Sequence, residues 1–152
     1  DLQVTNKQRR DRIQRLRNLR ERARDEKRGA LAKAQQRKEV AQLAHEEAET
    51  TWQERAAGIA APTITNAADF AANRMHLADL KLQAEHHRLE REAAEQEESE
   101  RRDETQVAQR ELRKMELWGE SENEKIRKEQ ARRDQILTDE MAAQISLREP
   151  RR

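Results

Sequence analysis

The only cluster of helix-breaking residues in this 152-residue chain lies between residues 58 and 66. Gly58 and Pro62 fall within the cluster and Asn66 closes it, whereas the rest of the chain has two glycines and one proline. A glycine followed by a proline ends a helix, and an asparagine can begin the next one. We therefore predict helices over about residues 6–57 and 67–148, joined by a turn over 58–66, with Asn66 as the N-cap of the second helix.

Strong helix formers, chiefly Ala, Glu, Arg, Gln and Leu, dominate both predicted helices. Thr5 and Gln8 have the spacing of a capping box, which would mark the start of the first helix. Asp69 would lie in the first turn of the second helix, where a negative charge is stabilising.

The chain has too few large apolar residues for a globular core. Leu, Ile, Val and Phe together make up 23 of the 152 residues, and 41% of residues are charged. Such a composition fits either a disordered chain or a coiled coil, which needs only a narrow apolar seam. The charges balance to +1, and this favours the coiled coil because disordered chains of this polarity often carry a large net charge. We predict an all-α fold of one domain over residues 1–152, a two-helix antiparallel coiled-coil hairpin with a longer, overhanging C-terminal helix.

The heptad pattern of each helix suggests how the two helices align. It places Ile13 and Leu16 on the seam of the first helix, and Leu112 and Met115 on the seam of the second. If facing positions have residue numbers that sum to about 128, Ile13 lies opposite Met115 and Leu16 lies opposite Leu112. This register sets large residues against large ones and alanines against alanines, and its fold point lies inside the predicted turn.

Charge supports the same hairpin. Residues 24–43 carry a net charge of +3, and their predicted partners, residues 85–104, carry −5. Each exposed ion pair contributes only about a few tenths of a kcal/mol, but the matching of signs helps to set the orientation. The register also predicts two like-charge contacts, Lys27 with Arg101 and Arg37 with Arg91.

The second helix outlasts the first, so residues beyond about 125 have no predicted partner in the chain. This overhang keeps apolar side chains, as an amphipathic docking helix does. They are Ile126, Ala131, Ile136, Leu137, Met141, Ala142, Ile145 and Leu147.

The sequence offers no catalytic motif and no apolar segment of the roughly 20 residues that cross a membrane. We expect no enzyme activity, no cofactor and no metal, because His86 and His87 are adjacent on a helix and should point apart. The chain has no cysteine and shows no apolar leader segment at its start, and both features lead us to expect a cytoplasmic protein.

Two features allow more than one interpretation. Residues 7–24 are rich in Arg, as in a nucleic-acid-binding basic helix, but Ile13, Leu16 and Leu19 lie among the arginines, as on a helix that packs against protein. We therefore favour a solvated or protein-binding face and expect no nucleic-acid partner. Trp52 and Phe70 flank the turn and could clamp it, or an exposed Trp could be a binding hot spot.

The second predicted helix contains Glu85-His86-His87-Arg88-Leu89 and, near its end, Arg133-Asp134-Gln135, Asp139-Glu140-Met141-Ala142 and Leu147-Arg148 before Pro150. These two stretches resemble the YscO/FliJ-type central stalk proteins of type III secretion and flagellar export ATPase complexes. Flagellar members close with a comparable pattern, although an aromatic residue takes the place of Met141. The hairpin with its overhang is also similar to the architecture of this family.

The resemblance implies a cytoplasmic, non-enzymatic stalk at the base of a bacterial secretion apparatus, monomeric when isolated. It would insert into a hexameric secretion ATPase and reach toward an export gate protein, and some members also bind secretion chaperones. The ATPase-binding end would comprise Ile13, Leu16, Leu112, Met115, Ile126, Ile136 and Met141. The gate-binding surface near the turn would include Leu80 and His87, whereas His76 and Gln83 depart from the apolar or small residues of the family. The alternatives are a structural coiled-coil dimer or scaffold and, less favoured, a nucleic-acid-binding basic helix.

Overall fold

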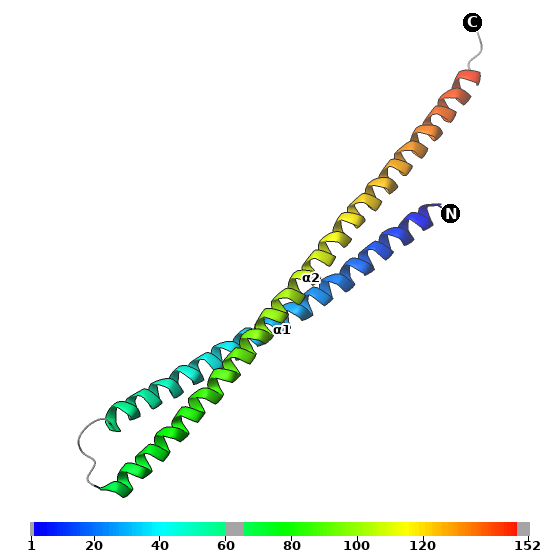
Figure 1. Ribbon diagram of the computed structural model, residues 1–152. Coiled ribbons are helices and arrows are strands. Elements are labelled where there is room, and N and C mark those ends of the chain that lie inside the picture. The colour runs from blue at the N-terminus through cyan, green and yellow to red at the C-terminus, as the bar shows by residue number, and fades with distance from the viewer. Residues whose placement is uncertain (1, 60–65, 149–152) are drawn as a thin grey trace. The chain divides into compact units, whose positions relative to one another are not determined.

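The computed structural model describes residues 2–59 and 66–148. Helix α1 spans Leu2–Ile59 and helix α2 spans Ala67–Arg148 (Figure 1). The two helices pack against each other in opposite directions, which confirms the predicted all-α helical hairpin. Contacts divide the chain into two units: residues 1–24 with 108–152, here the terminal unit, and residues 25–107, here the tip unit.

Of the two predicted helix starts, the first is wrong and the second is confirmed. Helix α1 begins at Leu2, so Thr5 lies inside it and the predicted capping box is wrong. Helix α2 begins as predicted, because the side-chain oxygen of Asn66 accepts a hydrogen bond from the backbone N–H of Asp69 at 2.8 Å. The carbonyl of Asn66 accepts a second bond, from the N–H of Phe70 at 3.2 Å. The predicted turn at Pro62 lies outside the described residues.

The alignment of the helices in the terminal unit differs from the predicted one by about one turn. Ile13 lies against Gly119, four residues beyond Met115, where we expected it. A Cβ atom placed on Gly119 would lie 2.9 Å from Cγ2 of Ile13, so glycine is needed for this close approach. Matching large residues with large ones was the wrong criterion, because a close-packed seam sets a large side chain against a small one.

The seam of the tip unit shows a related change on α1. The seam residues predicted on α2, such as Ala84 and Ala94, are buried or half-buried as expected. On α1, Ala34 is buried, but Lys38 enters the interface in place of Arg37, which is exposed. The other predicted seam residues of this part of α1, Ala41, Ala44 and Ala48, are half-buried as expected, so the change is limited to the position next to Arg37.

Ile126 is the best-buried large side chain of the described residues, with none of its surface exposed. Full burial of such a side chain stabilises a fold by about 1.5–3 kcal/mol. The predicted overhang, which began at Ile126, is therefore too long. Helix α1 starts about one turn earlier than expected, and its alignment with α2 is also shifted, so α1 covers α2 as far as about residue 133.

Ion pairs cross between the helices in both units. In the terminal unit, Arg9 binds Glu122 at 3.0 Å. In the tip unit, Arg37 binds Glu97 at 2.7 Å and does not make the predicted like-charge contact with Arg91. The other predicted conflict is resolved by a shared carboxylate.

That carboxylate is Glu104, whose Oε2 lies 3.0 Å from Nζ of Lys27 and 3.1 Å from a guanidinium nitrogen of Arg101. Two cations that the sequence analysis set in opposition therefore bind one acid between them. The hydroxyl of Thr105 lies 2.7 Å from the carbonyl of Arg101 and 3.2 Å from that of Lys27, so its single hydrogen is shared between the two helices at the same level of the hairpin.

Substitution of Gly119 tests the close approach. Gly119→Leu should lower the free energy of unfolding by about 1–3 kcal/mol, because its side chain must displace Ile13. The matched control is Gly29→Ala, since no atom lies within 4 Å of the added Cβ; it should raise the free energy of unfolding by about 0.8–1 kcal/mol. Urea unfolding followed by circular dichroism measures both. A Gly119→Leu protein as stable as the parent would contradict the alignment.

Disulfide trapping tests the register directly, because the chain has no cysteine of its own. The double variant Ile13→Cys/Gly119→Cys should oxidise readily, since these two positions are in contact. Ile13→Cys/Met115→Cys, which represents the register predicted from sequence, should oxidise far more slowly. Non-reducing electrophoresis and mass spectrometry of the monomer give the readout, and the opposite order of oxidation would show that the helices are shifted by a turn.

Candidate protein-interaction surfaces

The seven residues expected at the ATPase-binding end fall into two groups. Five belong to the contact between the helices: Ile13, Leu112 and Ile126 are buried, and Leu16 and Met115 are half-buried. The other two, Ile136 and Met141, are exposed on the last part of α2. Only this second group is available to a partner without parting the helices. The first group holds α1 and α2 together.

The last part of α2 is exposed along its whole described length. Every side chain from residue 134 to residue 147, here the overhang, is exposed. Its hydrogen bonds are local, as between Gln135 and Asp139 at 3.1 Å. Its apolar side chains are Ile136, Leu137, Met141, Ile145 and Leu147. A charged helix that exposes this many apolar residues without covering them is suited to bind another protein.

Arginines of α1 border the contact with α2 in the terminal unit. Arg9 and Arg17 reach across to Glu122 and Glu116, at 3.0 Å and 3.7 Å. These two arginines therefore help to join the helices, as expected for a helix that packs. Arg12 and Arg15 are exposed and remain available to an acidic partner.

Leu80 and His87, expected at the gate-binding surface, are both half-buried in the seam of the tip unit. Nδ1 of His87 lies 2.9 Å from Oε2 of Glu90, and Nε2 of His86 lies 3.2 Å from Oε1 of the same carboxylate. The expectation that the two histidines point apart was wrong, since Glu90 lies three and four residues after them on the helix and reaches both rings.

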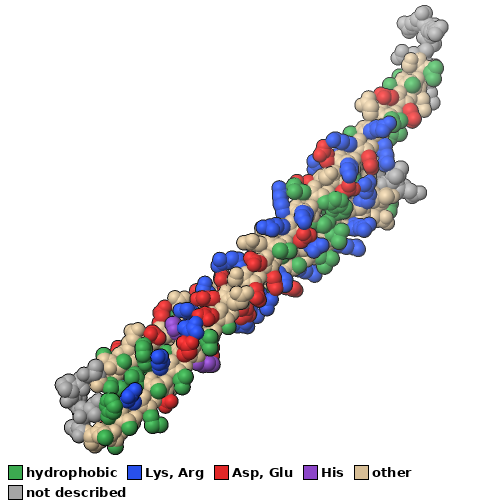
Figure 2. Space-filling view, viewed as in Figure 1, with side chains coloured by type: hydrophobic (Ala, Val, Ile, Leu, Met, Phe, Trp, Pro, Cys, Tyr) green, Lys and Arg blue, Asp and Glu red, His purple; other side chains and the backbone are tan. Residues whose placement is uncertain are grey.

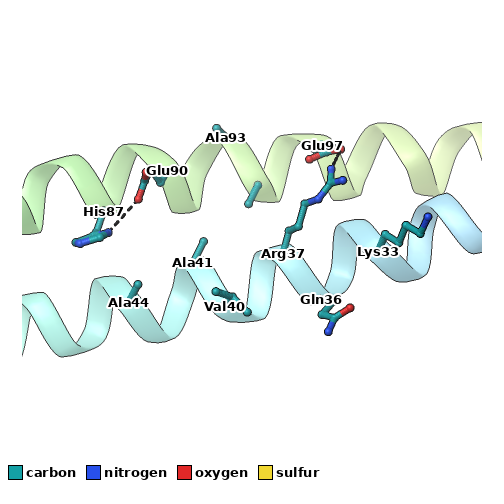
Figure 3. A pocket seen from close by; sticks show the side chains of 11 residues that line it. Lys33, Gln36, Arg37, Val40, Ala41, Ala44, His87, Glu90, Ala93 and Glu97 are labelled. Atoms are coloured by element: carbon teal, nitrogen blue, oxygen red, sulfur yellow. Dashed lines mark hydrogen bonds and ion pairs between the residues drawn. The ribbon is translucent and has the colours of Figure 1, made fainter.

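Between the helices of the tip unit lies a groove with a floor of small residues (Figure 3). Ala41, Ala44 and Ala94 line it, together with the ion pair Arg37–Glu97. His87 with Glu90 lies at one end and Lys33 toward the other, so small apolar residues lie between charged and polar ones. Alanines let the helices approach closely while they bury little area, and the contact is correspondingly thin here.

Glu98 is a buried acid in the same seam, with 5% of its surface exposed. Arg102 of α2 binds its Oε1, and Nζ of Lys38 lies 3.7 Å from its Oε2. A buried carboxylate needs such partners, because an unpaired buried charge is strongly destabilising. Glu98 therefore restricts which part of α1 can lie opposite it.

The aromatic residues of the tip unit each lie near a cation. Nζ of Lys81 lies 5.8 Å from the ring centroid of Trp52, which is half-buried, and Cζ of Arg74 lies 5.8 Å from that of Phe70. Trp52 thus contacts α2 through Lys81, whereas Phe70 is largely exposed. Trp118, in the terminal unit, is also exposed and so could contact a partner.

Some exposed apolar residues of α2 lie outside the surfaces predicted from sequence. Met75, Leu82 and Leu89 of α2 are all exposed, at intervals of seven residues. The predicted heptad seam comprises the residues that face α1, and these three lie outside that seam. A search for a second apolar repeat on the same helix would have found them.

Other kinds of site are not evident in the described residues. Residues 2–59 and 66–148 contain no group of three or more His, Cys, Asp or Glu side chains placed to hold a metal ion. Neither described helix has a stretch apolar enough to span a membrane.

Fold and surfaces together define a helical-hairpin protein with an uncovered apolar segment at the end of its second helix. A comparison with protein-family models gives a match to the family described as Flagellar FliJ protein, over residues 8–151. The chain therefore belongs to the FliJ family, whose members are structural components of an export apparatus rather than enzymes. No curated protein sequence and no solved structure matches the chain.

Glu104 gives the helix contact a pH dependence. Hydrogen bonds from Lys27 and then from Arg101 hold the pKa of Glu104 below its ordinary value. A lowered pKa in the folded state means that its stabilisation is present above the ordinary pKa of about 4.5 and is lost as the pH falls through the folded value. Glu104→Gln should thus lower the melting temperature at pH 7 and reduce the further fall between pH 5 and pH 3.

Glu124→Gln is the control for this experiment. Lys128, on the same helix, also lowers the pKa of Glu124, but the pair does not join α1 to α2. This variant should change the melting temperature at pH 7 less than Glu104→Gln does. Equal melting temperatures for the two variants at every pH would show that the bridge from Lys27 to Glu104 does not hold the helices together.

Proposed function

We propose that this protein is the non-enzymatic central stalk of a type III secretion or flagellar export ATPase complex. Membership of the FliJ family over residues 8–151 carries the proposal. The overhang supports it, because its exposed apolar residues have no cover in the described chain and need a partner. The partners would be the hexameric export ATPase, the export gate protein and secretion chaperones, at the cytoplasmic base of a bacterial secretion apparatus.

The stalk would act mechanically. The overhang, with Ile136 and Met141, would contact the ATPase, while Ile13, Leu112 and Ile126 hold α1 against α2 beside it. A single helix cannot present the same face to all six subunits of a hexameric ring. A bound stalk would therefore contact the six subunits differently. Leu80 and His87 would take part in contact with the gate protein, with His87 positioned by Glu90.

The hairpin argues against the alternative of a long parallel dimer. Such a dimer would pair each helix with its copy, whereas here the seam residues of α1 are covered by α2 of the same chain. We therefore expect a monomer in solution, which light scattering of the purified chain would show. The arginines that join α1 to Glu116 and Glu122 likewise favour a packing role for this basic helix over nucleic-acid binding.

Stimulation of the export ATPase of the same organism tests the proposal. The parent chain should raise ATP hydrolysis, and Ile136→Gln/Met141→Gln should need about tenfold more protein for the same effect, because two exposed apolar contacts are lost. Both residues are exposed, so the helices should remain folded. Leu43→Gln, which changes an exposed leucine of the tip unit, is the control and should act like the parent. Equal stimulation by all three proteins would exclude the overhang as the binding site, and no stimulation by the parent chain would refute the proposal.

A further inference from the structure

Helix α2 carries a second apolar repeat that plays no part in the contact with α1. Met75, Leu82 and Leu89, here the outer stripe, are 72%, 68% and 53% exposed. The stripe is about 21 Å long, at 1.5 Å per residue. In Figure 2, hydrophobic and cationic side chains lie together on the surface near the start of α2. Large apolar residues at regular heptad spacing on an outer helix face mark a surface that another helix can cover.

The position of the stripe separates it from the candidate gate surface. Leu82 lies two residues after Leu80, and Leu89 two residues after His87, so each is turned by about 200° around the helix. Leu80 and His87 are half-buried toward α1, and the stripe therefore faces away from it. A partner on the stripe would not need to part the hairpin.

Small residues extend the first part of the stripe into a coiled-coil seam, whereas Glu85 takes the corresponding position before Leu89. Ala71 and Ala78 are exposed and lie four residues before Met75 and Leu82. Together the four residues alternate at intervals of four and three, which is the spacing of the two core positions of a heptad. Alanine at one core position would let the partner helix approach closely.

A cation stands immediately before each residue of the stripe. The pairs are Arg74-Met75, Lys81-Leu82 and Arg88-Leu89. In a coiled coil the residue before the first core position flanks the seam and selects partners by charge. Arg74 and Lys81 lie over the rings of Phe70 and Trp52, contacts that leave their charge in place, whereas Arg88 is held by Glu85 and Glu92. Arg74 and Lys81 would thus provide most of the charge selectivity for a partner helix.

We propose that the outer stripe binds an α-helix of a partner protein whose apolar heptad face is flanked by acidic residues. The bound helix would lie along α2, with its apolar residues on Met75, Leu82 and Leu89 and its carboxylates beside Arg74 and Lys81. This inference goes beyond the proposed function, because the stripe is separate from both the overhang and the pair Leu80 and His87.

Other occupants fit the charges less well. A second copy laid antiparallel on the stripe would bring the two cationic flanks together, which is unfavourable. Asp79 lies on the other flank of the stripe and Glu85 lies within the seam, and both would repel a nucleic acid or an anionic membrane. An acidic helix meets the cations on one flank and can present a neutral or basic residue to Asp79 and Glu85.

Two synthetic helical peptides test the proposal. Both would have about 21 residues, or three heptads, with leucine at the core positions. One carries glutamate on the flank that would meet Arg74 and Lys81, and the other carries lysine there. Fluorescence anisotropy with the full chain should show at least about tenfold tighter binding of the glutamate peptide, and this preference should shrink as salt is added.

Variants of the chain then locate the binding site. Leu82→Gln/Leu89→Gln should weaken binding of the glutamate peptide by about tenfold or more. Leu43→Gln, which changes an exposed leucine of α1, is the matched control and should bind like the parent. Arg74→Glu/Lys81→Glu should reverse the preference between the peptides. Circular dichroism confirms that each variant keeps its helices, as exposure of these side chains predicts.

Four outcomes would overturn the proposal. The two peptides could bind equally well, or Leu82→Gln/Leu89→Gln could leave binding unchanged. Alternatively, the parent chain could fail to bind the glutamate peptide and instead dimerise, or bind phosphatidylglycerol vesicles, in a way that this double variant abolishes. None of these measurements uses the export ATPase, so their result is independent of the test of the stalk function.

Discussion

The contact of Ile13 with Gly119 fixes how the helices of the terminal unit align. A seam with so few large side chains has little apolar area with which to distinguish one register from another. Shape then matters more than area: the absence of a side chain at Gly119 creates the space that Ile13 fills. The same alignment brings Arg9 to Glu122 and Arg17 to Glu116 and leaves Ile126 fully covered. A helix that can satisfy all of these contacts in only one register does not need a large core to be specific.

In the tip unit, charged side chains determine how α1 and α2 align. Glu98 is buried between Lys38 and Arg102, and Glu104 binds Lys27 and Arg101 at once. Lys38 and Lys27 come from α1, so sliding α1 along α2 would separate them from Glu98 and Glu104 and leave each acid only its partner on α2. The alanines of the groove let the helices approach closely, and the two acids favour one alignment of the helices. This division explains how a seam built from Ala41, Ala44 and Ala94 can still hold one alignment.

Sequence was sufficient for the fold class and for the cap at Asn66, because stop signals and capping chemistry are local. It was insufficient for the register, which depends on how side chains from distant parts of the chain fit together. The positions of Ile13, Leu16, Leu112 and Met115 in the sequence are compatible with two alignments of the helices that differ by one turn. The sizes of these side chains do not show which of the two alignments forms. The difference rests on the space at Gly119, which becomes visible only when the helices are placed side by side. For the same reason, Ile126 was assigned to the free end of α2 although α1 covers it.

The exposed end of α2 also has a mechanical consequence. Up to about residue 133, α2 is braced by α1 through packing and ion pairs, and beyond it the overhang is a single helix. A pair of joined helices resists bending far more than one helix does. Flexure of the terminal unit under load should therefore concentrate where the bracing stops, close to Arg133. A partner that grips the overhang would experience a compliant coupling at that point, with the stiffer, paired part of α2 behind it.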